Sequence, residues 1–413
     1  MENPALRQRG NPTKPDQPVV ETKGKTVEAH PAGDIKHGGP VEILRLLLVI
    51  TYFLSSTFSI CLTQFFGVPL YWYNKDLYYA YMALTKQSFG IFVTTLTQWW
   101  TPTVVRISGD ASVAGQLKKT EDGRVECDFP DRMVLIANHQ LYSDWLYLWW
   151  IAYTNKTRMH GHIYIILKES LKYVPVIGWG MMFYGFIFIS TKTGTSFEAT
   201  EDSTLGPMSG SEGLDPMWLL LFPEGTNASD NGRRRSAQWA EKTGIKDMEH
   251  QLLPRSTGMY FCLNELDGTV EYVYDCTLAY EGIARGKFGQ DYYSLRSMYL
   301  QGRPPPSVNM YWRRFAVKDI PLGDHEEFDL WLRERWYEKD ALIDQYITTG
   351  RFPGIVKGTN GVTNGTVKEE HIETEVKLAH WWEVGNIFLV LATFGLVANI
   401  LARVWTGMIY GKT

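Results

Sequence analysis

The chain has 413 residues, of which 45% are hydrophobic and 21% are charged. This length fits one large domain or two ordinary ones, and the hydrophobic share is close to a globular average, which excludes a channel with many membrane spans. The net charge of −4 gives no support for broad binding to nucleic acid, so we expect no nucleic-acid partner.

The numbers of aromatic residues and cysteines carry information about the environment of the protein. The chain has 15 Trp and 23 Tyr, and both types favour membrane–water interfaces as well as protein cores. Cys61, Cys127, Cys262 and Cys276 stand far apart, without the CxxC or Cys/His spacing of a zinc site. We therefore expect no metal site, and four reduced cysteines that serve as small core side chains.

The N-terminal third divides into a polar stretch and two apolar stretches. Residues 1–40 are rich in Pro, Gly, Lys and Glu and lack an apolar period, which predicts a disordered tail. The apolar run from Val41 to Leu70 is long enough to cross a bilayer, which takes about 20 residues, but Ser, Thr and Gln interrupt it, so an interfacial or re-entrant helix is the alternative. Residues 77–105 carry a more amphipathic pattern. We expect residues 41–107 to form a hairpin of two membrane-associated helices.

The middle of the chain predicts a catalytic body with an α/β fold over residues 108–353. Continuous apolar strands separated by helical stretches are typical of a mainly parallel sheet flanked by helices. The acidic, Gly- and Ser-rich residues 193–217 predict a long loop. The expected strands are Met133–Ala137, His162–Leu167, Phe186–Ile189, Trp218–Phe222 and Val270–Tyr274.

The C-terminal part predicts a linker and a membrane anchor. Residues 354–380 contain a Gly- and Thr-rich stretch typical of a flexible linker. Residues 381–405 form a long apolar run with Trp381, Trp382 and Trp405 at its ends, as in a transmembrane helix with aromatic anchors. A buried core helix is the alternative.

The stretch "NHQLYSDW" places His139 and Asp144 five residues apart. On a regular helix their side chains would lie about 140° apart, so they can meet only if the chain bends between them. A strand ending at Ala137, a turn and a helix beginning near Ser143 would supply that bend, at the strand end where α/β sheets usually bind ligands. A carboxylate on one ring nitrogen fixes the histidine tautomer and leaves the other nitrogen as a base. Alternatively, Ser143 or Asp144 merely caps the helix.

The stretch "LFPEGTNAS" leads from a strand into a glycine-containing turn and an expected helix start. Backbone N–H groups at such a turn can hold an anion. Glu224 would repel a phosphate, so it either accepts a hydrogen bond from a substrate hydroxyl or organises the turn. Thr226 could cap the helix, and a purely structural turn around Gly225 is the alternative.

Two further stretches leave alternatives open. Arg233–Arg235 and Arg255 could pair with phosphate groups, or the triplet could be a solvated basic face. The apolar segment 171–190 fits a helix pair at the membrane, the wall of a tunnel for an acyl chain, or ordinary core packing. The chain contains no GxSxG, Walker or GxGxxG motif, so the corresponding hydrolase and nucleotide sites are not expected.

Together these blocks resemble the glycerolipid acyltransferase family, which includes 1-acylglycerol-3-phosphate acyltransferases. "NHQLYSDW" is similar to its NHx4D block, "LFPEGTNAS" to its EGT block, and "LKYVPVIGWGM" to its lysine, proline and Gly-Trp signature. "PRSTGMYFCL", "YDCTLAY", "RRFAVKDIP" and "WLRERWYEKD" resemble the branch containing lysocardiolipin and lysophosphatidylinositol acyltransferases. The resemblance extends from Val41 to Phe352, with the blocks in the expected order.

The sequence departs from the family in two places. One is the loop Thr193–Met217, which replaces a stretch that is usually more helical and contains Lys and Asp. The other is a single position. The family usually has an arginine, assigned to the glycerol phosphate, just after the strand expected at 186–189. Thr191 stands there, followed by Lys192, which would act as a point charge without bidentate geometry.

The resemblance implies acyl-CoA as co-substrate, no further cofactor, and a lysophospholipid acceptor: lysophosphatidic acid, lysophosphatidylinositol or monolysocardiolipin. His139 would be the base and Asp144 would orient it. The implied acceptor-binding residues are Lys192, Glu224, Gly225, Thr226 and Arg255. The alternative is a non-catalytic membrane scaffold that keeps the fold, against which the combination of His139, Asp144 and Glu224 speaks.

The expected location is a membrane, namely the endoplasmic reticulum with the catalytic domain facing the cytosol. Mitochondria or another internal membrane are the alternatives. A glycosylation sequon at Asn227 lies inside the expected site, which favours the cytosolic face.

Overall fold

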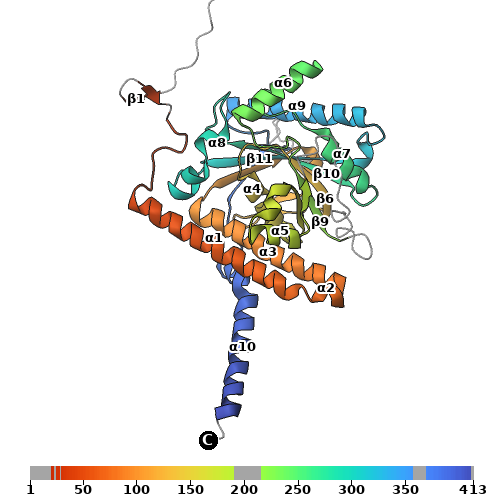
Figure 1. Ribbon diagram of the computed structural model, residues 1–413. Coiled ribbons are helices and arrows are strands. Elements are labelled where there is room, and N and C mark those ends of the chain that lie inside the picture. The colour runs from red at the N-terminus through yellow and green to blue at the C-terminus, as the bar shows by residue number, and fades with distance from the viewer. Residues whose placement is uncertain (1–19, 23–24, 28, 190–214, 357–368, 411–413) are drawn as a thin grey trace, which may run out of the picture.

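The structure is a computed structural model that describes residues 20–22, 25–27, 29–189, 215–356 and 369–410. Its centre is an eight-stranded sheet in the order β14-β3-β11-β10-β6-β9-β7-β8 (Figure 1). Five of its pairings are parallel, and β10–β11 and β14–β3 are antiparallel. The strands are β14 (Ile372–Glu375), β3 (Val104–Gly109), β11 (Ser307–Ala316), β10 (Tyr272–Tyr280), β6 (Arg132–Ala137), β9 (Met217–Leu221), β7 (Ile163–Lys168) and β8 (Ile187–Ile189).

Helices cover both faces of the sheet, which confirms the predicted α/β class with a mainly parallel sheet. The longer helices are α1 (Pro40–Gly67), α3 (Lys75–Trp100), α4 (Asp144–Thr154), α6 (Asp230–Thr243), α7 (Ser256–Glu265), α9 (His325–Thr349) and α10 (Asn386–Tyr410). The short ones are α2 (Leu70–Tyr73), α5 (Ile177–Phe183) and α8 (Gly289–Tyr292). Three small two-stranded pairs lie outside the sheet: β1 (Val20–Thr22) with β2 (Lys25–Val27), β4 (Leu117–Lys119) with β5 (Val125–Cys127), and β12 (Ile355–Val356) with β13 (Glu369–Glu370).

The sheet separates two hydrophobic cores. Alternate residues of a strand point to opposite faces, and β6 shows this division clearly. Met133, Leu135 and Ala137 join the core formed with α1, α3 and α4, whereas Val134 and Ile136 join the core formed with α6, α7 and α9. Because both faces are covered, the strand is apolar from Met133 to Ala137, as its sequence predicted.

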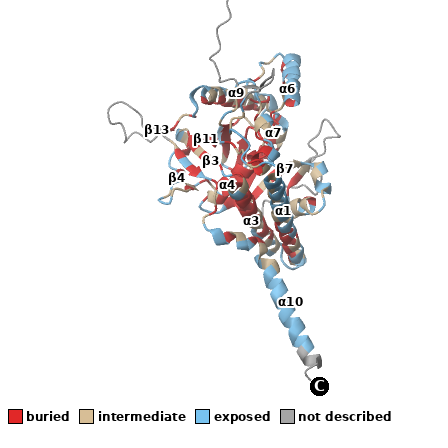
Figure 2. Cartoon of the chain, turned by 90° about the vertical axis from the view of Figure 1, so that its left-hand side faces the viewer, coloured by how far each residue is buried: buried red, intermediate tan, exposed pale blue. Residues whose placement is uncertain are grey.

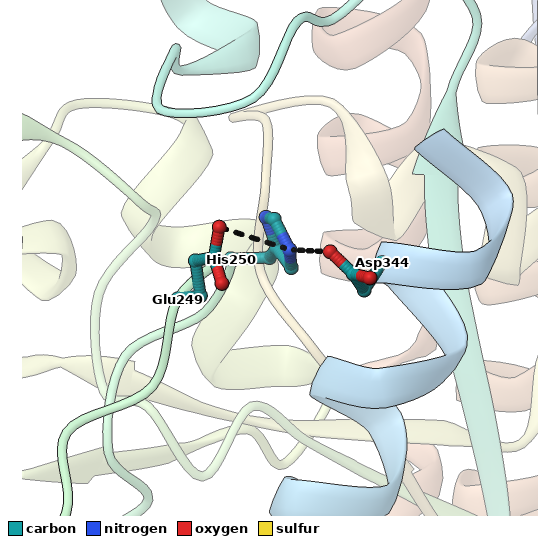
Figure 3. Close-up of side chains that lie close together, drawn as sticks. All are labelled: Glu249, His250 and Asp344. Carbon is teal, nitrogen blue, oxygen red and sulfur yellow. Dashed lines mark hydrogen bonds and ion pairs between the residues drawn. The ribbon is translucent and has the colours of Figure 1, made fainter. Parts of the chain in front are cut away.

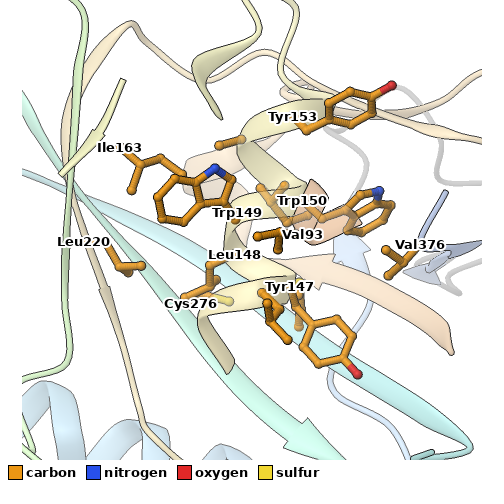
Figure 4. Packing of buried hydrophobic residues seen from close by; sticks show 14 of the residues in the cluster. Val93, Tyr147, Leu148, Trp149, Trp150, Tyr153, Ile163, Leu220, Cys276 and Val376 are labelled. Atoms are coloured by element: carbon orange, nitrogen blue, oxygen red, sulfur yellow. The ribbon is translucent and has the colours of Figure 1, made fainter. Parts of the chain in front are cut away.

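Helix α4 is buried around its whole circumference and packs behind the end of β6. Tyr147, Leu148, Trp149 and Trp150 are each at most 1% exposed, and Figure 4 shows them within the core that also contains Val93 of α3. Aromatic side chains of this size contribute much buried apolar area. The helix is therefore held rigidly, and with it the polar residue at its first position.

The N-terminal helices form the expected hairpin. Helix α3 packs against both α1 and α4, and α1 lies along the outside of the body (Figure 1). Exposed apolar side chains mark the outer face of α1: Val41, Ile43, Leu44, Leu47, Leu48, Leu54 and Phe58. Helix α3 ends at Trp100, and the next residues form strand β3, so the range 41–107 includes the start of the sheet.

Within the part of the chain that the structure describes, two segments are long and apolar enough to cross a membrane by length and composition: Pro40–Tyr73 and Trp381–Thr406. Helix α10 extends away from the body (Figures 1 and 2): Ile387 near its start is buried against α1, whereas residues 392–406 are exposed. That exposure rules out the alternative of a buried core helix.

The structure differs from expectation near both ends of the chain. Residues 1–19 of the expected tail lie outside the described part, but residues 30–37 pack on the body: His30 Nε2 lies 2.8 Å from Tyr292 O, and the N–H groups of Lys36 and His37 donate to Gln301 O. Within the expected linker, residues 357–368 are outside the described part, whereas β14 pairs with β3 at the sheet edge. The sequence did not predict β14, because the strand is short and its partner β3 is distant in the chain.

Candidate active site

His139 and Asp144 meet at the carboxyl end of β6. The strand ends at Ala137 and α4 begins at Asp144, so the intervening turn supplies the bend. His139 Nδ1 lies 2.9 Å from Asp144 Oδ2. The other ring nitrogen, Nε2, has no hydrogen-bond partner among the described residues, and His139 lines a cavity of about 1100 Å³. This geometry suits a general base.

The carboxylate of Asp144 is fully buried and closely held. Its Oδ2 also accepts hydrogen bonds from the N–H groups of Gln140 (2.7 Å) and Leu141 (3.0 Å). Its Oδ1 accepts one from the hydroxyl of Tyr280. Ser143 makes no side-chain capping bond. The contacts therefore do not fit the alternative in which Ser143 or Asp144 merely caps α4.

Tyr280 was not identified from the sequence. It is the last residue of β10, a strand parallel to β6, and parallel strands end at the same sheet edge. Tyr280 is the last residue of the block "YDCTLAY", but the predicted strand ended at Tyr274. The rest of the block was therefore not predicted to belong to the sheet.

Two opposing effects act on the pKa of His139. Burial alone would lower it, but the hydrogen bond and charge of Asp144, together with the charge of Glu224, raise the pKa above its ordinary value. The Asp144 carboxylate thus stabilises the protonated ring that forms when His139 takes a proton. The ring also stacks on Phe222, with centroids 4.4 Å apart.

Glu224 supports the turn that carries His139. Its Oε1 accepts a hydrogen bond from His139 N (2.9 Å) and its Oε2 accepts one from Leu252 N (3.2 Å). The side chain is buried and is not among the cavity-lining residues. Burial raises the pKa of Glu224 to about 7, although the two backbone hydrogen bonds act to lower it. Of the two roles expected for Glu224, its contacts match organisation of the turn and not contact with a substrate hydroxyl.

Gly225, Thr226 and Arg255 line the cavity together with His139. Gly225 has φ 72°, a left-handed conformation that favours glycine, and the Arg255 side chain lies over it. Thr226 does not cap α6, because Ser229 accepts the capping bond from Gly232 N. Lys192 lies outside the described residues.

The cavity has a volume of about 1100 Å³ and is mainly apolar. Its walls come from α1, α3, α4, α5 and β7. Of the roles open for segment 171–190, the structure shows a cavity wall, since Leu171, Ile177 and Met181 line it. Trp179 and Met182 of α5 are instead exposed.

Three cationic side chains line the cavity: Lys168, Arg255 and Arg296. Lys168 is the last residue of β7, whose carboxyl end shares the sheet edge of His139. Lys168 and Arg296 were missed from the sequence, because nothing local distinguishes them from other surface cations.

Within the Arg233–Arg235 triplet, Arg233 has a structural role, whereas Arg234 and Arg235 are exposed, as in the alternative of a solvated basic face. These residues lie on α6 and do not line the cavity. The Arg233 guanidinium donates to the carbonyl oxygens of Met248 and Glu249, which fixes the loop before Leu252.

Glu249, His250 and Asp344 form a cluster with the side-chain types of a metal site (Figure 3). His250 Nε2 lies 2.9 Å from Asp344 Oδ1. The guanidinium of Arg285 also pairs with Glu249 Oε1 (3.1 Å) and with Asp344. Since an arginine already neutralises both carboxylates, ion pairs account for the cluster. These ion pairs connect helix α9 to the loop that contains Leu252.

Sequence comparison covers both the site and the C-terminal part of the body. The family model described as Acyltransferase matches residues 122–281, and the one described as Acyltransferase C-terminus matches residues 298–381. The first contains His139, Asp144, Glu224 and Tyr280.

Similar proteins occur in fungi and animals. An uncharacterised acyltransferase of Schizosaccharomyces pombe is 37% identical over 347 residues, covering 84% of this chain and 93% of the relative. The 2-acyl-1-lysophosphatidylinositol acyltransferase of Saccharomyces cerevisiae is 36% identical over 71% of this chain and 81% of its own length. The human 1-acyl-sn-glycerol-3-phosphate acyltransferase gamma is 29% identical over 75% of both chains. Relatives match this chain along most of their length, and His139 and its buried partner Asp144 lie inside the matched region. The chain therefore belongs to the glycerolipid acyltransferase family.

Proposed function

We propose that the protein is an acyl-CoA-dependent acyltransferase that acylates the free glycerol hydroxyl of a lysophospholipid, in phospholipid synthesis or remodelling. The observation that carries this proposal is the His139–Asp144 pair, whose histidine lines a cavity of about 1100 Å³ with mainly apolar walls. Pockets for drug-sized ligands measure roughly 300–1,000 Å³, so this cavity has room for a long apolar chain.

The proposed reaction is direct acyl transfer. Nε2 of His139 takes the proton of the acceptor hydroxyl as that oxygen attacks the thioester carbonyl carbon. A C–O bond forms, the C–S bond breaks, and the electron pair leaves with the CoA sulfur. A thiol has a pKa of about 8.5, so the thiolate departs without strong acid help and can take the proton from His139. Asp144 keeps the proton of neutral His139 on Nδ1 and stabilises the ring when it is charged.

The apolar walls would hold the acyl chain, and the cations would hold the charged parts of the substrates. Gly225, Thr226 and Arg255 are proposed to hold the acceptor beside His139, with Lys192 as a further cation. Arginine binds phosphate oxygens in pairs, whereas lysine acts as a point charge. Acyl-CoA is a co-substrate in this scheme, and no other cofactor is proposed.

Three acceptors are candidates: lysophosphatidic acid, lysophosphatidylinositol and monolysocardiolipin. Relatives named for 1-acyl-sn-glycerol-3-phosphate, lysophosphatidylinositol and lysocardiolipin acylation support this set. To choose among them, purified full-length protein is incubated with labelled oleoyl-CoA and each lysolipid in turn. We expect label in the acylated product of one of the three acceptors.

His139→Ala tests the base. We expect the variant to lose transfer but to remain membrane-associated. His325→Ala is the matched control, because His325 is exposed at the start of α9 and does not line the cavity. Wild-type transfer by His139→Ala would remove His139 from the mechanism, and labelling of no acceptor by the wild type would support the scaffold alternative.

We also propose that the protein is anchored in the endoplasmic reticulum with its catalytic domain facing the cytosol. The exposed apolar length of α10, its flanking tryptophans and the outer face of α1 support membrane anchoring. Protease treatment of intact microsomes tests the orientation: a cytosolic domain is digested without detergent. Protection that persists until detergent is added would place it in the lumen.

A further inference from the structure

Tyr280 contacts the catalytic pair from a distant part of the chain. It ends strand β10, and its hydroxyl donates a hydrogen bond to Oδ1 of Asp144. Tyr280 is 1% exposed and Asp144 is 0% exposed, so water does not replace this bond. The proposed reaction assigns Tyr280 no task of its own.

The two oxygens of Asp144 differ in their partners. Oδ2 receives three contacts, from His139 Nδ1 and the N–H groups of Gln140 and Leu141. Oδ1 has only the Tyr280 hydroxyl among the described residues. A hydrogen bond to a carboxylate withdraws part of its negative charge. The single donor on Oδ1 therefore moderates how strongly Asp144 attracts the proton on His139.

We propose that Tyr280 is a positioning residue that orients Asp144 and limits the basicity of His139. This inference rests on the proposed function, in which His139 is the base. A base that holds its proton too tightly is protonated, and inactive, over more of the working pH range. The Tyr280 hydroxyl keeps the Asp144 carboxylate in the plane that meets Nδ1 and keeps the pair from becoming too basic.

Other charged and titratable groups near the pair would be unchanged by loss of this hydroxyl. Glu224 acts on His139 by its charge, and Tyr147 and Cys276 are close enough to feel the charge of Asp144. The cations that line the cavity are Lys168, Arg255 and Arg296. Asp144 keeps its backbone donors in a Tyr280 variant and then attracts the proton on His139 more strongly, so the pKa of His139 should rise.

Tyr280→Phe removes the hydroxyl and keeps the ring. Tyr147→Phe is the matched control: Tyr147 is also fully buried, its ring centroid lies 6.2 Å from that of Tyr280, and its hydroxyl gives no hydrogen bond to Asp144. For both variants kcat and KM are measured with acyl-CoA and the accepted lysolipid from pH 5 to 9. We expect kcat of Tyr280→Phe to fall roughly 10- to 100-fold, as for loss of a hydrogen bond to a charged group, with little change in KM.

The pH profile separates positioning from packing. Since His139 must be neutral to act, kcat/KM rises with pH through the pKa of the free enzyme's base. We expect this acid limb to move to higher pH in Tyr280→Phe and to stay in place in Tyr147→Phe. An unchanged kcat, or a lower kcat with an unmoved limb, overturns the inference while leaving the proposed function intact. Lack of transfer by the wild type would instead refute the proposed function itself.

Discussion

Gly225→Ala gives a quantitative test of the turn beside His139. At φ 72° an alanine costs roughly 1–2 kcal/mol relative to glycine, offset by about 0.4–1 kcal/mol from the lower entropy of the unfolded chain. With an unfolding entropy of about 2.1 cal/mol/K per residue, the net loss of about 1 kcal/mol lowers Tm by roughly 1 °C in a chain of this size. The new Cβ would lie 3.6 Å from Arg255 Cδ, an ordinary contact, so the turn itself has room for it.

The same methyl group would enter the space where we place the acceptor. An added methyl group in a binding pocket costs roughly 1–3 kcal/mol, so KM for the lysolipid should rise at least about fivefold. Gly244→Ala is the matched control, because Gly244 has φ 70° at the end of α6 and a Cβ there meets nothing within 4 Å. It should lose similar stability and keep its KM.

Differential scanning fluorimetry and steady-state kinetics on the three purified proteins complete the test. The reasoning fails if both variants show the same KM for lysolipid, since the methyl group at Gly225 would then be remote from the acceptor. It also fails if Gly225→Ala is much less stable than Gly244→Ala, since the strain would then come from more than the backbone.

Four further outcomes follow from the same contacts. Asp144→Asn should lower kcat by at least about 10²-fold, because the amide cannot stabilise the charged ring, and a single-turnover assay with labelled acyl-CoA measures this. The acid limb of wild-type kcat/KM should lie above pH 6.5, because the pKa of His139 is raised, and a limb below 6.5 contradicts that shift. The pKa of Glu224 is about 7 in the folded state against 4.5 normally, so the folded state binds its proton more tightly than the unfolded state. The free energy of unfolding therefore falls as pH rises between these values. Chemical denaturation at pH 5 and 8 should show a smaller fall in Glu224→Gln than in the wild type. A chain ending at Gly385, without α10, should be released from membranes by alkaline carbonate more readily than the full chain, and equal retention would show that α1 suffices.

The parts of the site that depend on local signals could be predicted from the sequence. A buried strand, a polar turn and an aromatic helix in succession predicted the bend that joins His139 to Asp144. Glu224 was correctly associated with the same edge of the sheet, because β9 precedes it directly. In these stretches each residue's neighbours in the chain are also its neighbours in the fold.

The remainder depends on contacts between distant segments. Tyr280 reaches Asp144 across 136 positions, and Leu252 N reaches Glu224 from a loop that has no regular pattern. Strand β3 follows α3 after a few residues, so an apolar helix pattern runs into an apolar strand without a clear break. Neither periodicity nor turn signals report which strands become neighbours.

The segment that joins the sheet to α10 fixes how the enzyme meets its substrates. Residues 376–385 connect β14 to α10, and fully extended they could reach no more than about 35 Å. They are also fastened down, since Leu378 N donates to Gln98 Oε1 (3.0 Å) and Ala379 N to the Tyr153 hydroxyl (2.7 Å). If α10 crosses the bilayer, the body cannot swing away from it, and its height and tilt are set. The acceptor would then be found by lateral diffusion in two dimensions, and the reaction rate would follow its surface density in the membrane instead of its concentration in water.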